Sequence, residues 1–518
     1  MNIYLSQGLD PLPTTILFIL PLLFLYAIVS RLRRKPPLPP GPKGLPIIGN
    51  MLTMDQFTLT NRGLANLAKK YGDMFHMKMG SVHMVAITSP EIAKQVLQVQ
   101  DNVFSDRPTS KATRYLSYNR ADLAFADYGP FWRQMRKLCV MRLFSRKRAE
   151  SWNSVRDEVE SMVKAVASNA GKPVNIGELI FTLTMNIIYR AAFGSINERK
   201  EEFLEIIQEF NKLFVSFNIS DFIPWLGWFD PNDLNNKLAK ARDSLDKFID
   251  KIIDDHVQKR TKIDGSDGGT IHDMVDEMLT FYGDDEVNVK ESDDLQSSIK
   301  LTKDNMKAII MDVMFGGVET VASIIEWALA ELIKSPDDLK RIQQELTEVV
   351  GLNRQVEEAH LEKLTFLKCA LKETLRLHPP IPVTHHATCK HAEVAGYSIP
   401  AKTRVIINIW ALMRDPNYWD DPETFRPSRF LKDGAPDFRG NNFEFIPFGS
   451  GRRSCPGMNL GLYGLEMAVA HLLHGFQWEL PDGMKPSELD MSESFGLTAQ
   501  RAIRLVAIPS PRLECPLA

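Results

Sequence analysis

The sequence has few cysteines, and their spacing is irregular. Five occur among 518 residues, at positions 139, 369, 389, 455 and 515. Their number is odd and no two of them form a Cys-x-x-Cys pair, which argues against a disulfide framework and against a zinc site. Scattered free thiols instead fit a protein of a reducing compartment.

The chain also lacks an excess of charge of either sign. Its 62 basic and 65 acidic residues leave a formal net charge of −3. Proteins that bind nucleic acids usually carry a strongly basic footprint, so no nucleic-acid partner is expected. Apolar residues at 44% and charged residues at 25% are typical of a globular protein. The length allows several domains or one large catalytic domain.

One long stretch near the N-terminus has no charge at all. No charged residue lies between Asp10 and Arg31, and residues 16–29 are almost purely apolar. This run approaches the roughly 20 residues that cross a bilayer. A cleaved signal peptide is the alternative, but no Lys or Arg precedes the run and no small-residue cleavage site is evident. The basic cluster at residues 31–35 predicts that the rest of the chain stays cytoplasmic. Residues 1–35 are therefore expected to form a single-pass anchor.

Proline marks the start of the folded region. Residues 36–42 read Pro-Pro-Leu-Pro-Pro-Gly-Pro, and the prolines predict a stiff, extended hinge before a catalytic domain at 43–518. A strand hairpin is expected at residues 74–79 and 83–88. Helical periodicity predominates beyond Pro90, notably at residues 92–98, 132–144, 154–167 and 201–217. The expected fold class is therefore mainly α with small β-sheets.

An aromatic loop follows the last of these helices. It contains Phe222, Ile223, Trp225, Leu226, Trp228 and Phe229. Two interpretations are open: a corner of the core, or a lip that enters the membrane interface.

The densest chemical pattern lies at residues 448–457, which read Phe-Gly-Ser-Gly-Arg-Arg-Ser-Cys-Pro-Gly. Apolar residues at helical spacing follow, so Cys455 is expected just before a helix N-terminus, where a thiolate is favoured. The glycines would let the backbone approach a flat ligand, and Arg453 could bind an anionic edge of it. Taken singly, a buried cysteine and a Gly-rich turn have commoner explanations.

The complete pattern resembles the haem-binding signature of the cytochromes P450. Phe448, Gly449, Arg453, Cys455 and Gly457 stand at the spacings of that signature. The resemblance implies the cytochrome P450 fold and haem b as cofactor, with Cys455 as the thiolate ligand of the iron.

A second match lies in a segment expected to form one long helix, residues 302–334. Gly316 and Gly317 lie in its middle, where each costs about 1 kcal/mol relative to alanine. The run Gly-Gly-Val-Glu-Thr-Val at 316–321 resembles the family's oxygen-activation motif and departs from it only at the last position. The resemblance implies that Glu319 and Thr320 deliver protons to dioxygen. A threonine hydroxyl bonded to the backbone would also loosen the helix. A solvated glutamate beside an ordinary helical threonine is the alternative.

Two further patterns match the family. Trp132 and Arg136 form its Trp-x-x-x-Arg motif on one helical face, and the resemblance implies that they meet one haem propionate. It implies the same role for Arg453, and His386 stands where a basic residue usually meets the other propionate.

Glu373 and Arg376 match the family's Glu-x-x-Arg, which is implied to be buried and joined by Arg429 in support of the haem pocket. An ordinary surface ion pair is the alternative.

The closest resemblance is to the ferulate/coniferaldehyde 5-hydroxylases of plants, carried by residues 128–137, 308–321, 443–448 and 481–486. It implies a monooxygenase of the endoplasmic reticulum membrane that faces the cytosol and hydroxylates a small aromatic substrate with O2. NADPH-cytochrome P450 reductase is the implied partner, because the chain has no flavin or nicotinamide fingerprint of its own.

The chain departs from that subgroup in two segments that border the substrate in this fold. Residues 383–391 read Val-Thr-His-His-Ala-Thr-Cys-Lys-His where the subgroup typically has Leu-Leu-Leu-His-Glu-Thr-Ala-Glu-Asp, and Val318 replaces its usual Thr. The polar pair Thr384 and His385 would favour a ligand with matching polar groups, unless the changes are neutral. Gly316 and Phe495 are further expected substrate contacts.

Three functions therefore remain open. The first is 5-hydroxylation of a coniferaldehyde- or ferulate-type phenylpropanoid. The second is hydroxylation of another specialised aromatic metabolite, such as an alkaloid or a lignan. The third is a haem-thiolate protein that binds without turnover, against which Thr320 argues.

Overall fold

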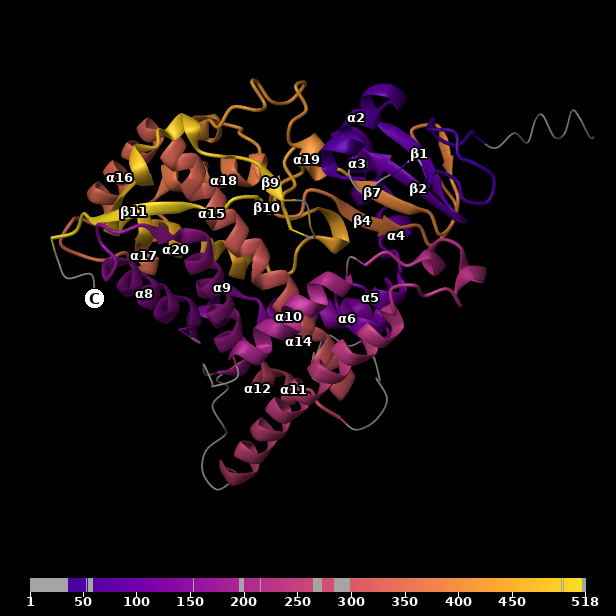
Figure 1. Ribbon diagram of the computed structural model, residues 1–518, viewed down its shortest axis with the longest axis horizontal. Helices are drawn as coiled ribbons and strands as arrows, with labels where there is room; N and C mark the ends of the chain where they lie inside the picture. The colour runs from indigo at the N-terminus through magenta and orange to yellow at the C-terminus, as the bar shows by residue number, and fades with distance from the viewer. Residues whose placement is uncertain are drawn as a thin grey trace, which may run out of the picture.

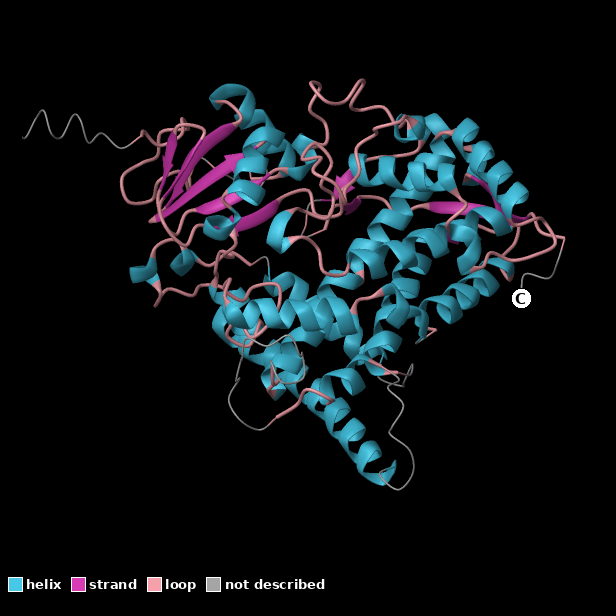
Figure 2. Ribbon diagram, turned by 180° about the vertical axis from the view of Figure 1, so that it is seen from behind, coloured by secondary structure: helices cyan, strands magenta, loops and turns pink. Residues whose placement is uncertain are grey.

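Helices make up most of the molecule, and its largest sheet lies at one end (Figures 1 and 2). The computed structural model describes residues 36–514, apart from 53, 55–58, 152, 195–199, 215, 264–272, 284–298, 495 and 497. The expected membrane anchor, residues 1–35, lies outside this range, as does the candidate substrate contact Phe495.

The largest sheet has four strands in the order β1-β2-β7-β4. The predicted hairpin is confirmed to within one residue, because β1 (Met74–Met79) pairs antiparallel with β2 (Val82–Ile87). Strand β7 (Arg404–Ile407) runs parallel to β2, and β4 (Thr384–Ala387) pairs antiparallel with β7. Residues more than 300 positions apart in the chain thus form one sheet, and β4 carries three of the candidate site residues.

Three smaller sheets lie elsewhere. Two of them are pairs, β5 (Ala392–Val394) with β6 (Tyr397–Ile399), and β9 (Glu493–Ser494) with β10 (Gln500–Arg501). The third joins β3 (Val174–Asn175), β11 (Val506–Pro511) and β8 (Phe476–Glu479).

The predicted helices are present, with small differences in their bounds. Helix α8 spans Ser154–Ala167 as predicted, and α10 spans Lys200–Phe214. The other two end in π-helical turns: α3 (Pro90–Lys94) continues at Gln95–Val99, and α6 (Pro130–Leu138) at Cys139–Leu143. The remaining helices are α2 (Asn61–Tyr71), α4 (Asp101–Phe104), α5 (Lys111–Leu116), α7 (Arg146–Ser151), α9 (Ile176–Phe193), α11 (Leu234–Ile263), α12 (Met274–Leu279), α14 (Lys303–Gly317), α15 (Glu319–Lys334), α16 (Pro336–Val349), α17 (Glu358–Leu361), α18 (Thr365–Leu377), α19 (Ile409–Leu412) and α20 (Met458–Gly475).

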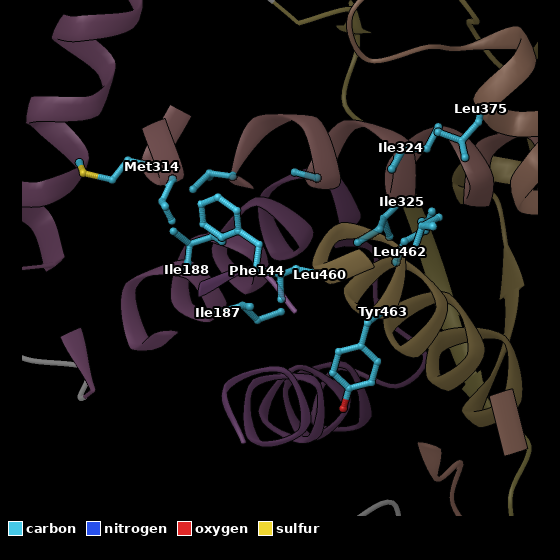
Figure 3. Packing of buried hydrophobic residues seen from close by; sticks show 14 of the residues in the cluster. Phe144, Ile187, Ile188, Met314, Ile324, Ile325, Leu375, Leu460, Leu462 and Tyr463 are labelled. Atoms are coloured by element: carbon cyan, nitrogen blue, oxygen red, sulfur yellow. The ribbon is translucent and has the colours of Figure 1, made fainter. Parts of the chain in front are cut away.

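The core lies where α9, α14, α15 and α20 pack together. Figure 3 shows Ile188, Met314, Ile325 and Leu462 among the buried side chains contributed by these four helices. Helix α9 and the segment 303–334 are apolar and long enough to span a membrane, but most of each is buried inside the domain. Their apolar surface therefore stabilises the core of this domain.

The expected single helix at residues 302–334 is interrupted, which corrects the sequence-based prediction. Helix α14 ends at Gly317 and α15 begins at Glu319, with Val318 between them at φ −87° and ψ −70°. The Thr320 hydroxyl donates a hydrogen bond to the Gly316 carbonyl at 2.6 Å. It therefore competes with the backbone N–H groups of the helix for this carbonyl. A Cβ at Gly317 would lie 2.5 Å from Cδ1 of Ile188, so this glycine allows α9 to approach.

The proline-rich segment packs against the folded domain. The backbone carbonyl of Pro37 accepts a hydrogen bond from Ser398 N at 2.9 Å, and that of Pro40 accepts one from His76 N at 2.8 Å. A Cβ at Gly41 would lie 1.8 Å from the His76 carbonyl oxygen, so only glycine allows this approach. Residues 37–41 therefore lie against an outer edge of the domain that follows them.

The aromatic loop is exposed at its tip. Trp225 is 67% exposed and Trp228 78% exposed, whereas Ile223 is buried. This exposure excludes a core corner for the two tryptophans. Ser81 N, in the β1–β2 turn, donates a hydrogen bond to the Phe222 carbonyl at 2.8 Å. The loop is thereby fixed beside the N-terminal part of the domain.

Buried charges connect α18 to the loop at residues 413–429. The side chains of Glu373 and Arg376 are both 0% exposed and bond through two N–H groups, with distances of 2.7 and 2.9 Å. Arg429 Nε donates to the same carboxylate at 2.9 Å. Arg376 also donates to the carbonyls of Met413 and Pro422. The carboxylate thus holds two guanidinium groups from distant segments.

This network predicts a large loss of stability when its acid is neutralised. Glu373→Gln leaves two buried guanidinium groups without a counter-ion, so the free energy of unfolding should fall by about 3–5 kcal/mol. Urea unfolding of the haem-loaded protein measures the change. In the matched control, Asp243→Asn removes the ion pair with Lys247, whose side chains are 63% and 75% exposed, and should cost less than about 1 kcal/mol. Equal effects of the two variants would contradict a central role for Glu373.

Candidate functional site

The cysteine loop has the local structure that its sequence predicts. A single 3-10 turn at Gly451–Arg453 precedes Cys455, and α20 begins three residues beyond it at Met458. The amide of Cys455 donates to the Phe448 carbonyl at 2.8 Å, which closes the loop. The half-buried ring of Phe448 packs edge-on against Phe438 at 5.1 Å between centroids. Cys455 is therefore held on a short, closed loop before a helix N-terminus.

Two glycines of this loop are required by its backbone. Gly449 and Gly451 have φ of +69° and +71°, a region that favours glycine. A Cβ at Gly451 would also lie 2.1 Å from the carbonyl oxygen of Leu97. Gly457 has no non-neighbouring atom within 4 Å of the position that its Cβ would take, so the backbone there borders open space.

Cys455 has an accessible side chain in a setting that is otherwise shielded by protein. Burial raises the pKa of the Cys455 thiol, while the Gly457 amide and the Arg136 guanidinium oppose the shift and lower that pKa. An N–H donor and a cation near the sulfur stabilise its thiolate form.

Helix α14 contributes a second wall with open space beside it. Gly316 is exposed although its helix runs through the centre of the domain, and a Cβ there would meet nothing within 4 Å. Thr320 follows one turn later on the same face and is half-buried. Val318, by contrast, is completely buried in the core. The two expected substrate contacts on this segment, Gly316 and Val318, therefore differ in accessibility.

The arginine beside the cysteine is buried and bonded to backbone carbonyls. Arg453 donates to Ser105 O at 2.7 Å, to Leu123 O at 3.2 Å and to Ala126 O. Trp132 Nε1 donates to the same Leu123 carbonyl at 3.0 Å. The Arg453 guanidinium lies 4.4 Å from the centre of the Trp132 ring. Residues 105–126 thus provide the partners of both candidate propionate ligands.

Arg136 and His386 also lie at this site. Arg136 Nη2 donates to the Ser454 hydroxyl at 3.0 Å, directly beside Cys455. His386 Nδ1 donates to the Phe104 carbonyl at 2.9 Å. Burial holds the pKa of His386 well below its usual range, and the nearby Arg107 lowers that pKa further. The imidazole is therefore neutral near pH 7.

Arg107 is a site residue that sequence reasoning missed. It donates to the His385 carbonyl, and burial lowers its pKa to about 10, with a further contribution from Arg136. A single arginine before Pro108 in a loop has no periodicity that would have drawn attention to it.

The cations at this site fit an anionic, planar ligand. Burial lowers the pKa of Arg453 to about 9, and Arg107 lowers it further. Asp106 and Asp122 offset this repulsion only in part. Buried cations whose hydrogen-bond partners are mostly neutral carbonyls are unfavourable unless an anion compensates them. The two propionates of haem supply such charge, so the residues present fit haem.

The acid of the oxygen-activation motif is held by neighbouring elements. Asn211 of α10 donates through Nδ2 to Glu319 Oε1 at 2.7 Å. Side-chain hydrogen bonds from Thr498 and Gln500 also reach this carboxyl, and all three lower its pKa. Burial is the larger effect, so the pKa of Glu319 lies above its usual value. The sequence motif identified the acid, but not these partners.

Two of the residues that depart from the plant subgroup, Thr384 and His385, lie on β4. Strand alternation places Thr384 and His386 on one face of β4 and His385 on the other. His385 has accessible surface although protein encloses it, and burial lowers the pKa of its imidazole to about 4. Arg107 and Arg404 lower that pKa further. Thr384 is half-buried.

Comparison with known proteins gives a consistent result. The family model described as cytochrome P450 matches residues 39–505. The chain is 63% identical over 522 residues to cytochrome P450 84A1 of Arabidopsis thaliana, covering 100% of both chains. It is 57% identical to cytochrome P450 84A4 of the same plant, over 97% of this chain and 98% of the relative.

A solved structure shows the same fold. A zebra fish cytochrome P450 with progesterone matches with a TM-score of 0.72 at 24% identity, over 87% of this chain and 99% of that chain. The arrangement around Cys455, the family model and the two plant relatives agree. The chain belongs to the cytochrome P450 family and is a haem-dependent monooxygenase that receives its electrons from a reductase.

Proposed function

We propose that this monooxygenase 5-hydroxylates the aromatic ring of coniferaldehyde- or ferulate-type phenylpropanoids. An aromatic cluster beside the oxygen-activation segment is the observation that carries the proposal. Phe315 directly precedes Gly316, and its ring lies 5.7 Å from Phe210 and 5.5 Å from Phe214. Phe214 also lies 5.0 Å from Phe125, in the loop before α6. Aromatic rings favour such offset and edge contacts, so the cluster suits a planar aromatic substrate.

The protein residues around the cofactor have separate roles. Haem, when bound, supplies the activation of dioxygen and the insertion of one oxygen atom into the substrate. The Cys455 thiolate would ligate its iron. The proposed propionate partners are Arg107, Trp132, Arg136, His386 and Arg453.

Thr320 and Glu319 are the proposed proton donors. The Thr320 hydroxyl bonds to the Gly316 carbonyl beside the interruption at Val318, and it borders the side of the helix where Gly316 is exposed. The raised pKa of Glu319 allows its carboxyl to carry a proton closer to neutral pH than an exposed glutamate would. Asn211 orients that carboxyl from α10.

The electron-donating partner is proposed to be NADPH-cytochrome P450 reductase. A surface pocket beside the cysteine loop is lined by Tyr128, Trp132, Arg133, Arg136, Lys137, Val140, Met141 and Arg452. Four of these residues are basic, and Arg452 stands three residues before Cys455. A basic surface favours an acidic partner and speeds its association, and docking here would bring electrons close to the sulfur.

The attachment is proposed to be to the endoplasmic reticulum membrane through a single-pass anchor at residues 1–35. The exposed side chains of Trp225 and Trp228 support a second contact, because tryptophan is enriched at membrane interfaces. Leu45 and Ile47 are 51% and 71% exposed. Their segment is bonded to the β1–β2 turn, which also holds the aromatic loop, because Gly80 N donates a hydrogen bond to Ile48 O. Both apolar segments therefore extend from one edge of the domain.

A second candidate function is the hydroxylation of another aromatic metabolite, such as an alkaloid or a lignan. The accessible polar side chains of Thr384 and His385 favour it. A neutral imidazole and a hydroxyl can each donate and accept hydrogen bonds. Val318 has no accessible surface, so its replacement of threonine acts, if at all, through packing.

The first prediction for the site concerns the axial ligand. Cys455→Ala removes the sulfur, so the reduced protein with carbon monoxide should lose the thiolate-type Soret band. Cys369→Ala is the matched control, because this buried free cysteine lies on α18. A thiolate-type band in Cys455→Ala would overturn the assignment.

The second prediction concerns proton delivery. Thr320→Ala should lower the product formed per NADPH several-fold while haem remains bound, because the hydroxyl beside the oxygen-activation site is lost. Thr184→Ala is the matched control, since Thr184 makes the same bond to the carbonyl four residues earlier, in α9. Unchanged coupling in Thr320→Ala would show that protons arrive by another route.

The third prediction tests the substrate. With reductase, the protein should turn over coniferaldehyde and ferulate faster than a panel of alkaloids and lignans. Thr384→Leu combined with His385→Leu restores the apolar pattern and should raise kcat/KM for coniferaldehyde relative to the best polar substrate by about tenfold or more. A preferred substrate outside the phenylpropanoids would favour the second candidate function. An unchanged ratio would mean that the two polar residues do not select the substrate.

A further inference from the structure

We propose that Asp122 and Asp312 share one proton, and that this carboxyl pair fastens residues 117–128 to α14 and so positions the cations of the haem site. The inference rests on the proposed role of those cations toward the propionates. Neither aspartate belongs to a motif of the family signature described above. Asp122 is buried in the loop before α6, and Asp312 is half-buried in α14.

Hydrogen bonds to the two carboxyl groups hold the loop at residues 117–128 against α14. Asp312 Oδ2 accepts the backbone N–H of Leu123 at 2.8 Å and that of Ala124 at 3.2 Å. Asp122 accepts the N–H of Phe125 at 3.1 Å from each of its oxygens. The two carboxyl groups are also hydrogen-bonded to each other. Two ionised carboxylates have no donor between them, so this contact needs one proton.

The fastened loop carries the acceptors of the haem-site cations. Leu123 donates its amide to Asp312, and its carbonyl accepts Arg453 Nη1 at 3.2 Å and Trp132 Nε1 at 3.0 Å. One peptide segment therefore connects the carboxyl pair to two of the proposed propionate partners. Asn305 Nδ2 of α14 donates to Ala121 O at 2.9 Å and provides a second, uncharged tie to the same loop.

The surroundings of the pair support one shared proton. The Cys139 thiol faces it from the π-helical turn after α6, and burial raises the pKa of that thiol, so it is neutral. The Arg107 and Arg453 guanidinium groups face Asp122 and favour one negative charge on the pair. Burial raises the pKa of both aspartates. Asp122 raises the pKa of Asp312 further, whereas the hydrogen bond with Asp312 lowers the pKa of Asp122.

The sign of the pH dependence follows from these shifts. In the unfolded chain both aspartates ionise near their usual pKa, whereas the folded protein retains a proton to higher pH. The contribution of the pair to stability is therefore largest at low pH and falls as pH rises through the folded pKa. Two adjacent carboxylates then repel each other, and the loop should loosen together with its hold on Arg453.

The test compares two substitutions at one position in the haem-loaded protein. Asp312→Asn keeps an oxygen for the two backbone amides and supplies an N–H donor to Asp122 at every pH. Asp312→Leu removes the fastening altogether. For each variant, the rate of haem transfer to an acceptor protein and the thiolate-type Soret band with carbon monoxide are measured from pH 6.5 to about 9.5.

The wild-type protein should release haem about tenfold faster at the alkaline end, the order of effect expected for one unsatisfied buried group. Asp312→Asn should lose this alkaline acceleration, and Asp312→Leu should release haem rapidly at every pH. The control Asp246→Asn alters another tie to this loop, since Asp246 accepts from Tyr118 and Lys307, and it should keep the wild-type pH dependence.

Equal pH profiles of the wild-type protein and Asp312→Asn would overturn the shared proton. If Asp312→Leu retained haem as well as the wild-type protein does, the carboxyl pair would not position the cations of the haem site. If Asp312→Leu fails to fold, Asp122→Asn replaces it and should also flatten the alkaline profile. Loss of the thiolate band in Cys455→Ala, together with an unaltered profile in Asp312→Asn, would reject this inference and leave the proposed site intact.

Discussion

Buried positive charge beside Cys455 is the constraint on which the rest of the structure depends. Arg107, Arg136 and Arg453 converge on one interior region, and their partners there are mainly carbonyls and hydroxyls. Such a cluster is unfavourable unless an anion joins it, which ties the folded domain to its cofactor. The loop at residues 117–128 supplies carbonyls to the cluster, and α14 anchors that loop through Asp312. The cofactor site and the central helix are thus one connected assembly.

The interruption at Val318 is a second feature of the central helix that shapes the site. Gly317 admits Ile188 of α9, and Gly316 leaves open space on the other side. The Thr320 hydroxyl competes for the Gly316 carbonyl beside this interruption, next to the proposed proton donors. Glu319 is held from outside by Asn211 of α10. Movement of α10 would therefore alter both the aromatic cluster around Phe315 and the orientation of the Glu319 carboxyl, so the proposed substrate and proton-donor sites share one helix.

Stability and specificity are located in separate parts of the fold. The Glu373 network joins α18 to a distant loop through side chains that are almost completely buried, so it serves the scaffold. Thr384 and His385, two of the departures from the typical plant 5-hydroxylase pattern, lie on β4, an edge strand of the four-stranded sheet. An edge strand can change side chains on its accessible positions without disturbing the helical core. Substrate preference can thus diverge while the reaction is kept.

The sequence by itself determined the features that depend on neighbouring residues. The spacing around Cys455 predicted its place before α20, and alternation at residues 74–87 predicted the β1–β2 hairpin. The motif at 316–321 identified Glu319 and Thr320, but local pattern could not reveal that the helix breaks between them and Gly317. Only the tertiary structure showed Arg107, Asn211 and the Asp122–Asp312 pair. Their partners lie up to about 280 residues away, and a long-range contact between polar groups has no periodicity in the sequence. The accessibility of Thr384 and His385, and the burial of Val318, were decided in the same way, by what other segments pack against them.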